Sequence, residues 1–261
     1  MDLQLIGKNA LVVASSQGLG KAIAEQLAEE GANVMVVGRH EDKLKKVAEE
    51  LEASGTGKVA YCPCDITKSA DIKQLVAKTV EAFGGIDILI NNAGGPPAGT
   101  FEDMDDEDWQ QAFELNLLSY IRLIRASLPY LKQSHGRIVN IASSSIKEPI
   151  SGLILSNTFR TGIVGLAKTL VTELAPDRIL INTVAPGRIA TDRIKHLDKV
   201  NSEKNDTPLE EWEEQMKSSI PLGRYGEPAE FAKVVTFLVS GANTFVTGTS
   251  LLVDGGMVKS I

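Results

Sequence analysis

Cysteine, histidine and aromatic residues are scarce in this chain of 261 residues, which has two cysteines, three histidines and 5% aromatic residues. Cys62 and Cys64 are separated by one residue at the end of an apolar run, and His40, His135 and His196 are scattered along the chain. These residues form no cluster with the spacing of metal ligands, so we expect no metal site and two buried, reduced thiols.

Positive charge is also in deficit, since the formal net charge is −7 and the pI is near 5.1. A non-specific nucleic-acid surface needs clustered lysine and arginine, so we expect no nucleic-acid partner. No apolar run has the length of a membrane span, and the start, "MDLQLIGKNALVV", lacks a basic segment followed by a long apolar one. We therefore expect a cytoplasmic protein without a membrane partner.

Short apolar runs alternate with stretches of helical periodicity through most of the chain. Hydrophobic residues make up 43% of the composition, which suffices for a sizeable core. The apolar runs are "NALVVA", "NVMVVG", "VAYCP", "IDILIN", "GRIVNIA", "ILINTVA" and "SLLVDGG". Strands that alternate with helices indicate crossover connections and a parallel sheet covered on both faces. The pattern predicts an α/β protein with a single Rossmann-like, doubly wound parallel sheet.

No low-complexity linker divides the chain, so we interpret residues 1–261 as one domain. The polar segment 188–220 interrupts the alternation and is predicted to form a substrate lid within that domain. Its "PLEEWEEQM" portion predicts a short amphipathic helix with Trp212 and Met216 facing the pocket. The alternative is a solvated surface segment that packs these two residues locally.

Two glycines follow the first apolar run, in "VASSQGLGKAIAEQL". Gly18 and Gly20 lie where a turn opens a helix. The absence of side chains there would let the backbone approach a pyrophosphate, and the helix N-terminus would offer free N–H groups to its charge. A Gly-x-Gly sequence alone occurs in many turns, so further motifs are needed.

Such motifs are present in the same order and spacing as in the short-chain dehydrogenase/reductase family. They are the glycine loop, "NNAG", "NIASSS", "APGRIATD", "PLGRYGEPAEFA" and "VTGTSLLVDGG". The chain resembles this family over essentially its whole length. "GRIVNI" and "PLGRYGEPAEFA" are most similar to the members that resemble 3-oxoacyl-[acyl-carrier-protein] reductase.

The resemblance implies a set of cofactor-binding positions, for each of which the alternative is a turn or strand-end residue without a ligand. The set comprises Ala14, Ser15, Ser16, Gln17, Gly18, Leu19, Gly20, Asp65, Ile66, Asn92, Ala93, Gly94, Arg160, Pro186, Gly187, Ile189 and Thr191. Asp65 and Ile66 would contact the adenine, and Ile189 and Thr191 the nicotinamide carboxamide. Ala14 replaces the family's first glycine, which requires a backbone conformation that suits a β-carbon.

The end of the second apolar run, "VVGRH", bears on which nicotinamide cofactor is used. A carboxylate at this place would bind the 2′-hydroxyl of NAD, but the chain has Gly38 followed by Arg39. A guanidinium suits a 2′-phosphate, so we expect NADP(H) in preference to NAD(H). The alternative is an ordinary surface arginine at the end of a strand.

The resemblance also implies the catalytic positions. Asn116 and Ser143 match the family's asparagine and serine, whereas Ser156 and Arg160 stand at its tyrosine and lysine positions. A phenol with a pKa of about 10 can be tuned into a usable acid, whereas a serine hydroxyl is a much weaker one. Arginine keeps a positive charge but gives up no proton at ordinary pH.

Two other residues are candidates for the missing acid. Lys147 lies in a loop expected to border the pocket, and Tyr120 lies one helical turn after Asn116. The alternatives are a solvated loop charge for Lys147 and a packing residue for Tyr120.

These observations favour an NADP(H)-dependent oxidoreductase that acts on a small carbonyl or hydroxyl substrate, with 3-oxoacyl thioesters among the candidates and a nonstandard proton donor. The alternative is a catalytically silent, NADP-binding family member with a regulatory or partner-binding role. The stretch 153–174 is apolar on more than one helical face, which, with the resemblance, predicts a homodimer or homotetramer.

Overall fold

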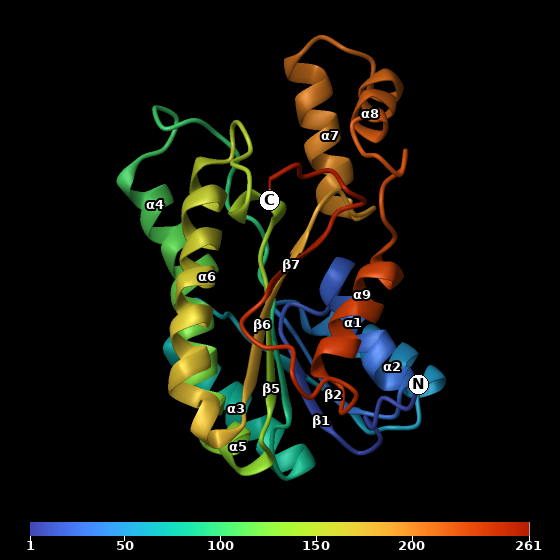
Figure 1. Ribbon diagram of the computed structural model, residues 1–261, viewed down its shortest axis with the longest axis vertical. Helices are drawn as coiled ribbons and strands as arrows, with labels where there is room; N and C mark the ends of the chain where they lie inside the picture. The colour runs from blue at the N-terminus through green and yellow to red at the C-terminus, as the bar shows by residue number, and fades with distance from the viewer. Residues whose placement is uncertain (261) are drawn as a thin grey trace.

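A seven-stranded parallel sheet forms the centre of the molecule, which is described by a computed structural model covering residues 1–260 (Figure 1). The strand order is β3-β2-β1-β4-β5-β6-β7. The strands are β1 (Asn9–Val12), β2 (Asn33–Gly38), β3 (Val59–Pro63), β4 (Ile88–Asn91), β5 (Arg137–Ile141), β6 (Leu180–Pro186) and β7 (Ser250–Val253). The predicted Rossmann-like, doubly wound fold is confirmed.

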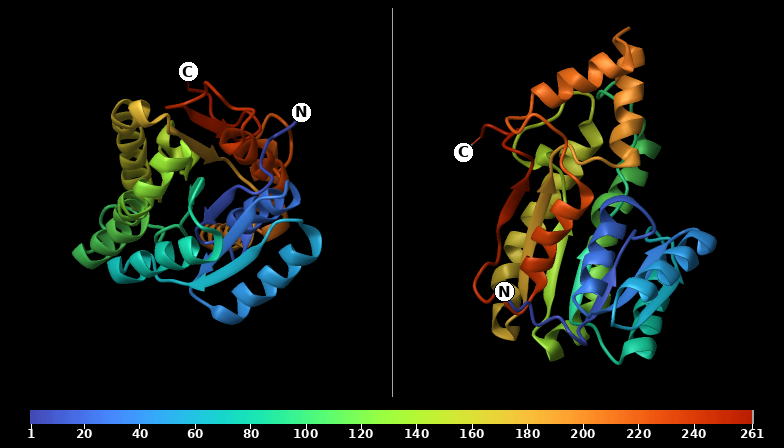
Figure 2. Two further views of the ribbon diagram at one scale, coloured as in Figure 1. Left: turned by 90° about the horizontal axis from the view of Figure 1, so that it is seen from below. Right: turned by 90° about the vertical axis from the view of Figure 1, so that its right-hand side faces the viewer.

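Helices cover both faces of the sheet (Figures 1 and 2). One face carries α1 (Gly18–Glu29), α2 (Glu41–Ser54) and α9 (Pro228–Val239), and the other carries α3 (Ser69–Phe83), α5 (Ser119–Ser134) and α6 (Ile154–Leu174). The remaining helices are α4 (Asp106–Phe113), α7 (Asp192–Lys204) and α8 (Leu209–Ser218).

Alternating residues of each central strand belong to the two opposite cores. In β1, Ala10 and Val12 pack in the core with α1, α2 and α9, whereas Leu11 packs in the core with α3, α5 and α6. All three are fully buried. A strand buried on both faces is continuously apolar, which explains why the sequence shows apolar runs without polar alternation.

The strand order reverses between β1 and β4, which are neighbours in the sheet but not in the chain. The chain leaves β1 toward α1 on one face, and it leaves β4 toward α5 on the other. The segments that follow these two strands therefore diverge. In open α/β folds, ligands bind in the crevice outside the carboxyl ends of the strands at such a point.

The segment 188–220 forms α7 and α8, which project together beyond the carboxyl ends of the strands (Figure 1). The predicted helix in "PLEEWEEQM" is present as α8. Trp212, however, donates a hydrogen bond from Nε1 to Asp198 Oδ1 of α7 over 3.2 Å. The expectation that Trp212 faces the pocket is therefore corrected in favour of local packing between the two helices. The orientation of Met216 toward the pocket stays a prediction.

Asp198, in the middle of α7, is the centre of a buried polar cluster. It pairs with Arg188, and its Oδ2 accepts a hydrogen bond from the Tyr225 hydroxyl over 2.9 Å. The Arg188 guanidinium also lies 5.2 Å from the centre of the Tyr225 ring. A fully buried carboxylate requires such partners, because an unpaired buried charge is strongly destabilising.

Both cysteines lie buried between the sheet and α3, and neither forms a disulfide. Burial is the main cause that raises the pKa of both thiols, and it raises that of Cys64 to about 12. Within residues 1–260, no helix is long and apolar enough to cross a membrane.

Cys64 is expected to resist alkylation in the folded protein at pH 8 and to react after unfolding in urea, because the reactive thiolate is suppressed and shielded. The raised pKa also means that this thiol's contribution to stability is present below pH 9 and is lost as the pH rises toward 12. Mass spectrometry after iodoacetamide treatment measures the labelling. Rapid modification of folded Cys64 at pH 8 would contradict the burial.

Candidate active site

The loop after β1 makes a tight turn that requires glycine. A β-carbon on Gly20 would lie 2.2 Å from the Ala14 carbonyl oxygen, which is an impossible approach. Gly18 has a φ of +58°, in the left-handed region that favours glycine. The Asn92 amide donates to the same Ala14 carbonyl over 3.3 Å, so the carboxyl end of β4 supports this turn.

Ala14 also lies in the left-handed region, with a φ of +51°. The conformation therefore does not favour a residue with a β-carbon, and a left-handed L-residue costs roughly 1–2 kcal/mol. The substitution of alanine for the family's glycine leaves the turn intact but strained.

The other residues of this loop have different surroundings. The Ser15 hydroxyl is fully buried, donates to Val12 O over 2.7 Å and accepts from Val37 N over 2.9 Å. Ser15 therefore fastens the turn to β1 and β2, and its side chain is fully used. Gln17 is exposed at the start of α1, Ser16 and Leu19 are half-buried, and the N-terminus of α1 is open to the crevice side. This is the geometry in which backbone N–H groups bind phosphate.

Arg39 lies exposed at the end of β2. Within residues 1–260 it forms neither an ion pair nor a side-chain hydrogen bond, so its guanidinium is available to a ligand. The Asp65 carboxylate accepts from the Thr67 hydroxyl over 2.8 Å. Burial alone would raise the pKa of Asp65, but the Thr67 hydrogen bonds and the charges of Lys68 and Arg39 lower it overall. The neighbouring Ile66 is buried in the core.

Three side chains from distant parts of the chain bind three carbonyls of the loop after β4. Arg160 Nη2 of α6 donates to Ala93 O over 3.1 Å. Asn116 Nδ2 donates to Gly94 O over 2.8 Å, and Arg193 Nη2 of α7 donates to Pro96 O over 3.0 Å. We call residues 93–96 the β4 loop. Its path is therefore determined by side chains of three separate helical segments.

Asn116 lies in a single π-helical turn, Glu114–Leu118, between α4 and α5. Such turns occur frequently at functional sites because they displace side chains from the regular helical positions. The Asn116 side chain is fully buried, and its Oδ1 has no hydrogen-bond partner within the protein. A buried amide oxygen without a partner is suited to a bound water or ligand donor.

Arg160 is 5% exposed and points toward the sheet. Its Nη1 donates to Ile141 O over 2.6 Å and to the Tyr120 hydroxyl over 3.1 Å. With its bond to Ala93, this guanidinium joins the carboxyl ends of β4 and β5. Its Nε is buried without a partner. The side chain is thus held by backbone carbonyls, which leaves little freedom to reorient.

Tyr120 is fully buried beneath Arg160, and its hydroxyl donates to Ile141 O over 2.9 Å. Burial raises the pKa of Tyr120, although the adjacent Arg160 charge partly counteracts it. The packing alternative for Tyr120 is therefore the one that the structure supports. Tyr120 cannot contact a substrate in this arrangement, and it positions Arg160 instead.

The two predicted catalytic serines lie beside the Arg160 guanidinium, whose bonds to Ala93, Ile141 and Tyr120 we call the Arg160 clamp. Ser143 caps a short 3-10 turn, Ser144–Ile146, and its Oγ accepts from Ser145 N over 3.2 Å, so its proton is free to be donated. Ser156 lies half-buried in the first turn of α6, which packs against that 3-10 turn. Lys147 is exposed at the end of the turn, as the solvated alternative expects.

The predicted residues after β6 lie at the same edge of the sheet. Pro186 ends β6, and Gly187 N donates to Val253 O over 3.0 Å. Ile189 is buried, whereas Thr191 caps the N-terminus of α7. A β-carbon on Gly18 would lie 3.8 Å from the Thr191 methyl group. Thr191 therefore lies across the crevice from the glycine loop.

Arg193 is the residue at this site that the sequence reasoning missed. It comes two positions after Thr191, and a cation so close to the end of "APGRIATD" was the signal that could have identified it. Its contact with the β4 loop depends on the placement of α7, which no local pattern shows.

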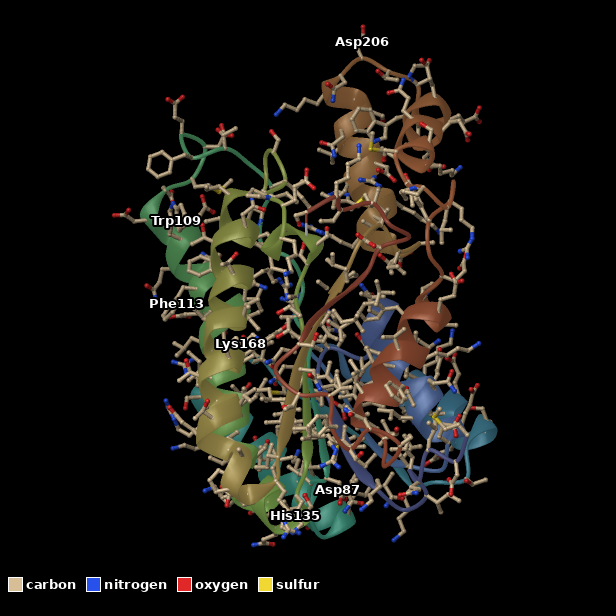
Figure 3. The ribbon with its side chains drawn as sticks, viewed as in Figure 1. Asp87, Trp109, Phe113, His135, Lys168 and Asp206 are labelled. Atoms are coloured by element: carbon tan, nitrogen blue, oxygen red, sulfur yellow. The ribbon has the colours of Figure 1, made fainter. Side chains whose placement is uncertain are left out.

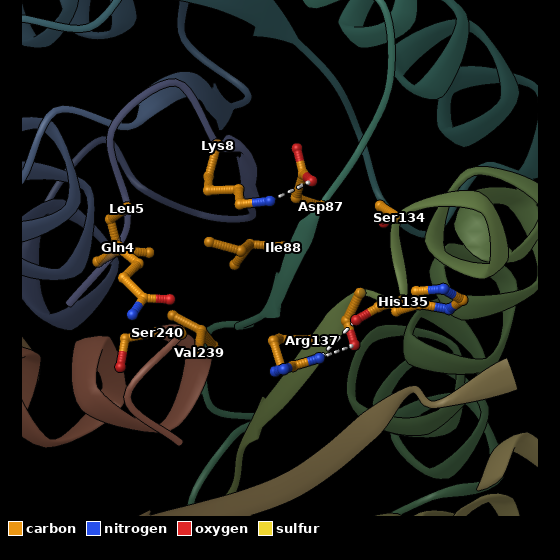
Figure 4. Close-up of a pocket in the computed structure, with 12 residues that line it drawn as sticks. Gln4, Leu5, Lys8, Asp87, Ile88, Ser134, His135, Arg137, Val239 and Ser240 are labelled. Carbon is orange, nitrogen blue, oxygen red and sulfur yellow. Dashed lines mark hydrogen bonds and ion pairs between the residues drawn. The ribbon is translucent and has the colours of Figure 1, made fainter. Parts of the chain in front are cut away.

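A separate cavity of about 270 Å³ lies at the opposite, amino-terminal edge of the sheet. Asp87 and His135 mark this end of the molecule in Figure 3, and Figure 4 shows the lining. Lys8 is 3.4 Å from Asp87, and Arg137 donates to the carbonyls of His135 and Gly136. The cations of this cavity are thus already bound by the protein, and the cavity contains none of the predicted site residues.

Comparison with known proteins agrees with this geometry. A family described as enoyl-(acyl carrier protein) reductase matches residues 13–258. The 3-oxoacyl-[acyl-carrier-protein] reductase of Aquifex aeolicus is 36% identical over 258 residues, covering 98% of this chain and 100% of that protein. Human dehydrogenase/reductase SDR family member 4 is 36% identical over 256 residues, covering 97% of this chain and 88% of that protein.

Among solved structures, L-sorbose reductase from Gluconobacter frateurii, complexed with NADPH and L-sorbose, matches with a TM-score of 0.95. The identity is 32%, and the match covers 100% of both chains. The chain therefore belongs to the short-chain dehydrogenase/reductase family.

Replacing Arg160 with methionine is expected to lower the free energy of unfolding by about 3 kcal/mol, because the buried carbonyls of Ala93 and Ile141 lose a charged donor. Arg160→Lys should cost less, since it keeps a donor and the charge. Urea denaturation measures both. Arg125→Met, at an exposed arginine of α5, is the control, and an equal effect of Arg160→Met and Arg125→Met would contradict the clamp.

Proposed function

We propose that this protein is an NADP(H)-dependent oxidoreductase that acts on a small carbonyl or hydroxyl substrate. The observation that carries the proposal is the convergence of the glycine loop, the β4 loop and the Ser143 turn on the crevice between β1 and β4. The sheet brings a phosphate-binding turn and a hydroxyl donor to one edge, as hydride transfer between a cofactor and a carbonyl requires.

The residues present fit a nicotinamide dinucleotide. Gly20 allows the close backbone approach, the α1 N-terminus supplies free N–H groups, and Arg39 is available to a 2′-phosphate. The cofactor, when bound, supplies or accepts the hydride. Thr191 and the buried Ile189 would border the nicotinamide, and Asp65 and Ile66 the adenine. Asn92 to Gly94, with Pro186 and Gly187, would form the walls between them.

Within this site, Ser143 donates a hydrogen bond to the carbonyl oxygen and so polarises it. Ser156, at the family's tyrosine position, supplies a second hydroxyl donor. The unpartnered Oδ1 of Asn116 holds a water in the cleft. Each of these groups stabilises developing negative charge on oxygen, but none is an acid matched to neutral pH.

Arg160, at the family's lysine position, keeps a positive charge next to the cleft. Its guanidinium is occupied with the carbonyls of Ala93 and Ile141, so it maintains the shape of the site and transfers no proton. The proton then comes from water or from the substrate. Losing a positioned general acid typically costs about 10²–10⁴ in rate, so we expect a slow enzyme on substrates that need one.

A catalytically silent NADP-binding protein is the second candidate, and Ser156 with Arg160 favours it. In that case the Arg160 clamp maintains the fold and the cofactor crevice, and the protein turns over no substrate. Binding without turnover on any carbonyl substrate distinguishes this candidate from the first.

Two further features belong to the proposal. The pair α7 and α8, within a single domain spanning the chain, forms a lid over the cleft.

The half-buried Phe159 of α6 contacts Trp109 and Phe113 of α4. The centre of its ring lies 5.8 Å from that of Trp109 and 6.0 Å from that of Phe113. Trp109 and Phe113 are labelled in Figure 3. We propose that this aromatic side of the molecule contributes to a homodimer or homotetramer.

The main experiment follows the loss of NADPH absorbance with a 3-oxoacyl thioester, the substrate class named for the Aquifex aeolicus relative. The natural protein is tested beside the double variant Ser156→Tyr/Arg160→Lys, which restores the family's acid. We expect slow turnover by the natural protein and a rate at least tenfold higher for the double variant. NADPH binding without turnover by the natural protein, with turnover by the variant, would instead support the silent member.

Arg39→Ala is expected to weaken NADPH binding by about 10- to 100-fold and to leave NADH binding unchanged, because only NADPH carries the 2′-phosphate that a guanidinium can bind. Fluorescence titration of both cofactors measures the two affinities. Lys45→Ala, which removes an exposed cation from α2, is the control. Equal weakening of NADH and NADPH would show that Arg39 does not select the cofactor.

A further inference from the structure

Arg193 extends from the first turn of α7 to the β4 loop. Its Nη2 donates to Pro96 O over 3.0 Å. A β-carbon on Gly95 would lie 2.9 Å from Nη2 and 3.2 Å from the central guanidinium carbon. The guanidinium therefore lies directly on the backbone of Gly95, and it connects the proposed lid to the floor of the cleft.

Most of the hydrogen-bonding capacity of this guanidinium is unused. An arginine carries five N–H groups, of which the bond to Pro96 uses one. Asp192 is its neighbour in the chain, yet among residues 1–260 no carboxylate forms an ion pair with Arg193. Arg193 is exposed as a whole, but its guanidinium is part-buried where it binds Pro96, and an anionic ligand there would supply the counter-charge that the described residues do not.

A second cation lies nearby on the same loop. Arg160 binds the carbonyl of Ala93 and likewise has no carboxylate partner within the described residues. Burial, and then the charge of Arg160, lowers the pKa of Arg193. The β4 loop is thus bordered by two guanidinium groups, and no carboxylate among residues 1–260 forms an ion pair with either.

We propose that Arg193 binds a carboxylate group of the substrate, so that the natural substrate is an oxo acid or the corresponding hydroxy acid. The inference rests on the proposed function and specifies its substrate class. A carboxylate accepts two parallel N–H bonds from one guanidinium, and such pairs are stronger than neutral hydrogen bonds. The carboxylate would supply the counter-charge that the protein lacks here.

The cofactor pyrophosphate is the competing anion, because Thr191 lies opposite Gly18 in the crevice. Arg193 is held on Gly95 and Pro96, beyond Gly94 along the chain from β4, whereas the pyrophosphate would lie on the glycine loop after β1. The two assignments predict different losses when Arg193 is replaced.

The test compares the binding of 2-oxobutanoate and acetoacetate with that of their methyl esters, by ligand-observed NMR with and without saturating NADP⁺. We expect each acid to bind at least tenfold more tightly than its ester, and Arg193→Met to abolish that preference. Arg193→Lys, which keeps the charge but not the bidentate geometry, should retain part of it. NADP⁺ affinity should stay within about twofold in both variants.

Lys195→Met is the control, since this exposed lysine lies two residues further along α7 and so on another side of the helix. It should change neither preference. Equal binding of acids and esters, absence of binding by both, or loss of NADP⁺ affinity in Arg193→Met with an unchanged acid preference would each overturn the proposal. Failure of NADP⁺ to bind at all would overturn the proposed function alone, because the acid preference is also measured without cofactor.

Discussion

The carbonyl groups at the carboxyl ends of β4 and β5 impose the constraint on which the site depends. Carbonyl groups at the ends of these strands are no longer paired within the sheet. Because they are buried, they need hydrogen-bond donors from elsewhere. Arg160 supplies them to Ala93 and Ile141 from a neighbouring helix, and the Tyr120 hydroxyl supplies a second donor to Ile141. The β4 loop, the Ser143 turn and the start of α6 are consequently held together by one guanidinium.

This arrangement explains how an arginine can be buried here without a carboxylate. Two oriented carbonyl dipoles, together with the Tyr120 oxygen, face the guanidinium in a region of low dielectric, where each such contact is stronger than in water. The same contacts remove the mobility that a proton-transferring side chain needs. Structural support requires a fixed side chain at position 160, whereas proton transfer requires a mobile one. Arg160 meets the structural requirement.

The fold was predictable because its strands are short apolar runs separated by helical periodicity. Gly18 and Gly20 were predictable because a tight turn before a helix leaves a local sequence pattern. Trp212 was not, since amphipathicity shows that a side faces inward but not whether it meets a pocket or another helix. Arg193 and Tyr120 depend on how α5, α6 and α7 are placed around the β4 loop, and such long-range contacts leave no periodic signal. The family resemblance supplied the candidate roles that spacing alone could not.

The Asp198 cluster has a consequence for movement above the cleft. Asp198 of α7 accepts from Trp212 of α8 and also binds Arg188 and Tyr225, which lie before and after the helix pair in the chain. Separating the two helices would cost this buried carboxylate one of its three partners. The two helices should therefore stay together. Because Arg188 and Tyr225 lie outside the pair, the same carboxylate also fastens α7 to the chain on either side of it, and any movement of the pair would have to give up contacts of a buried charge.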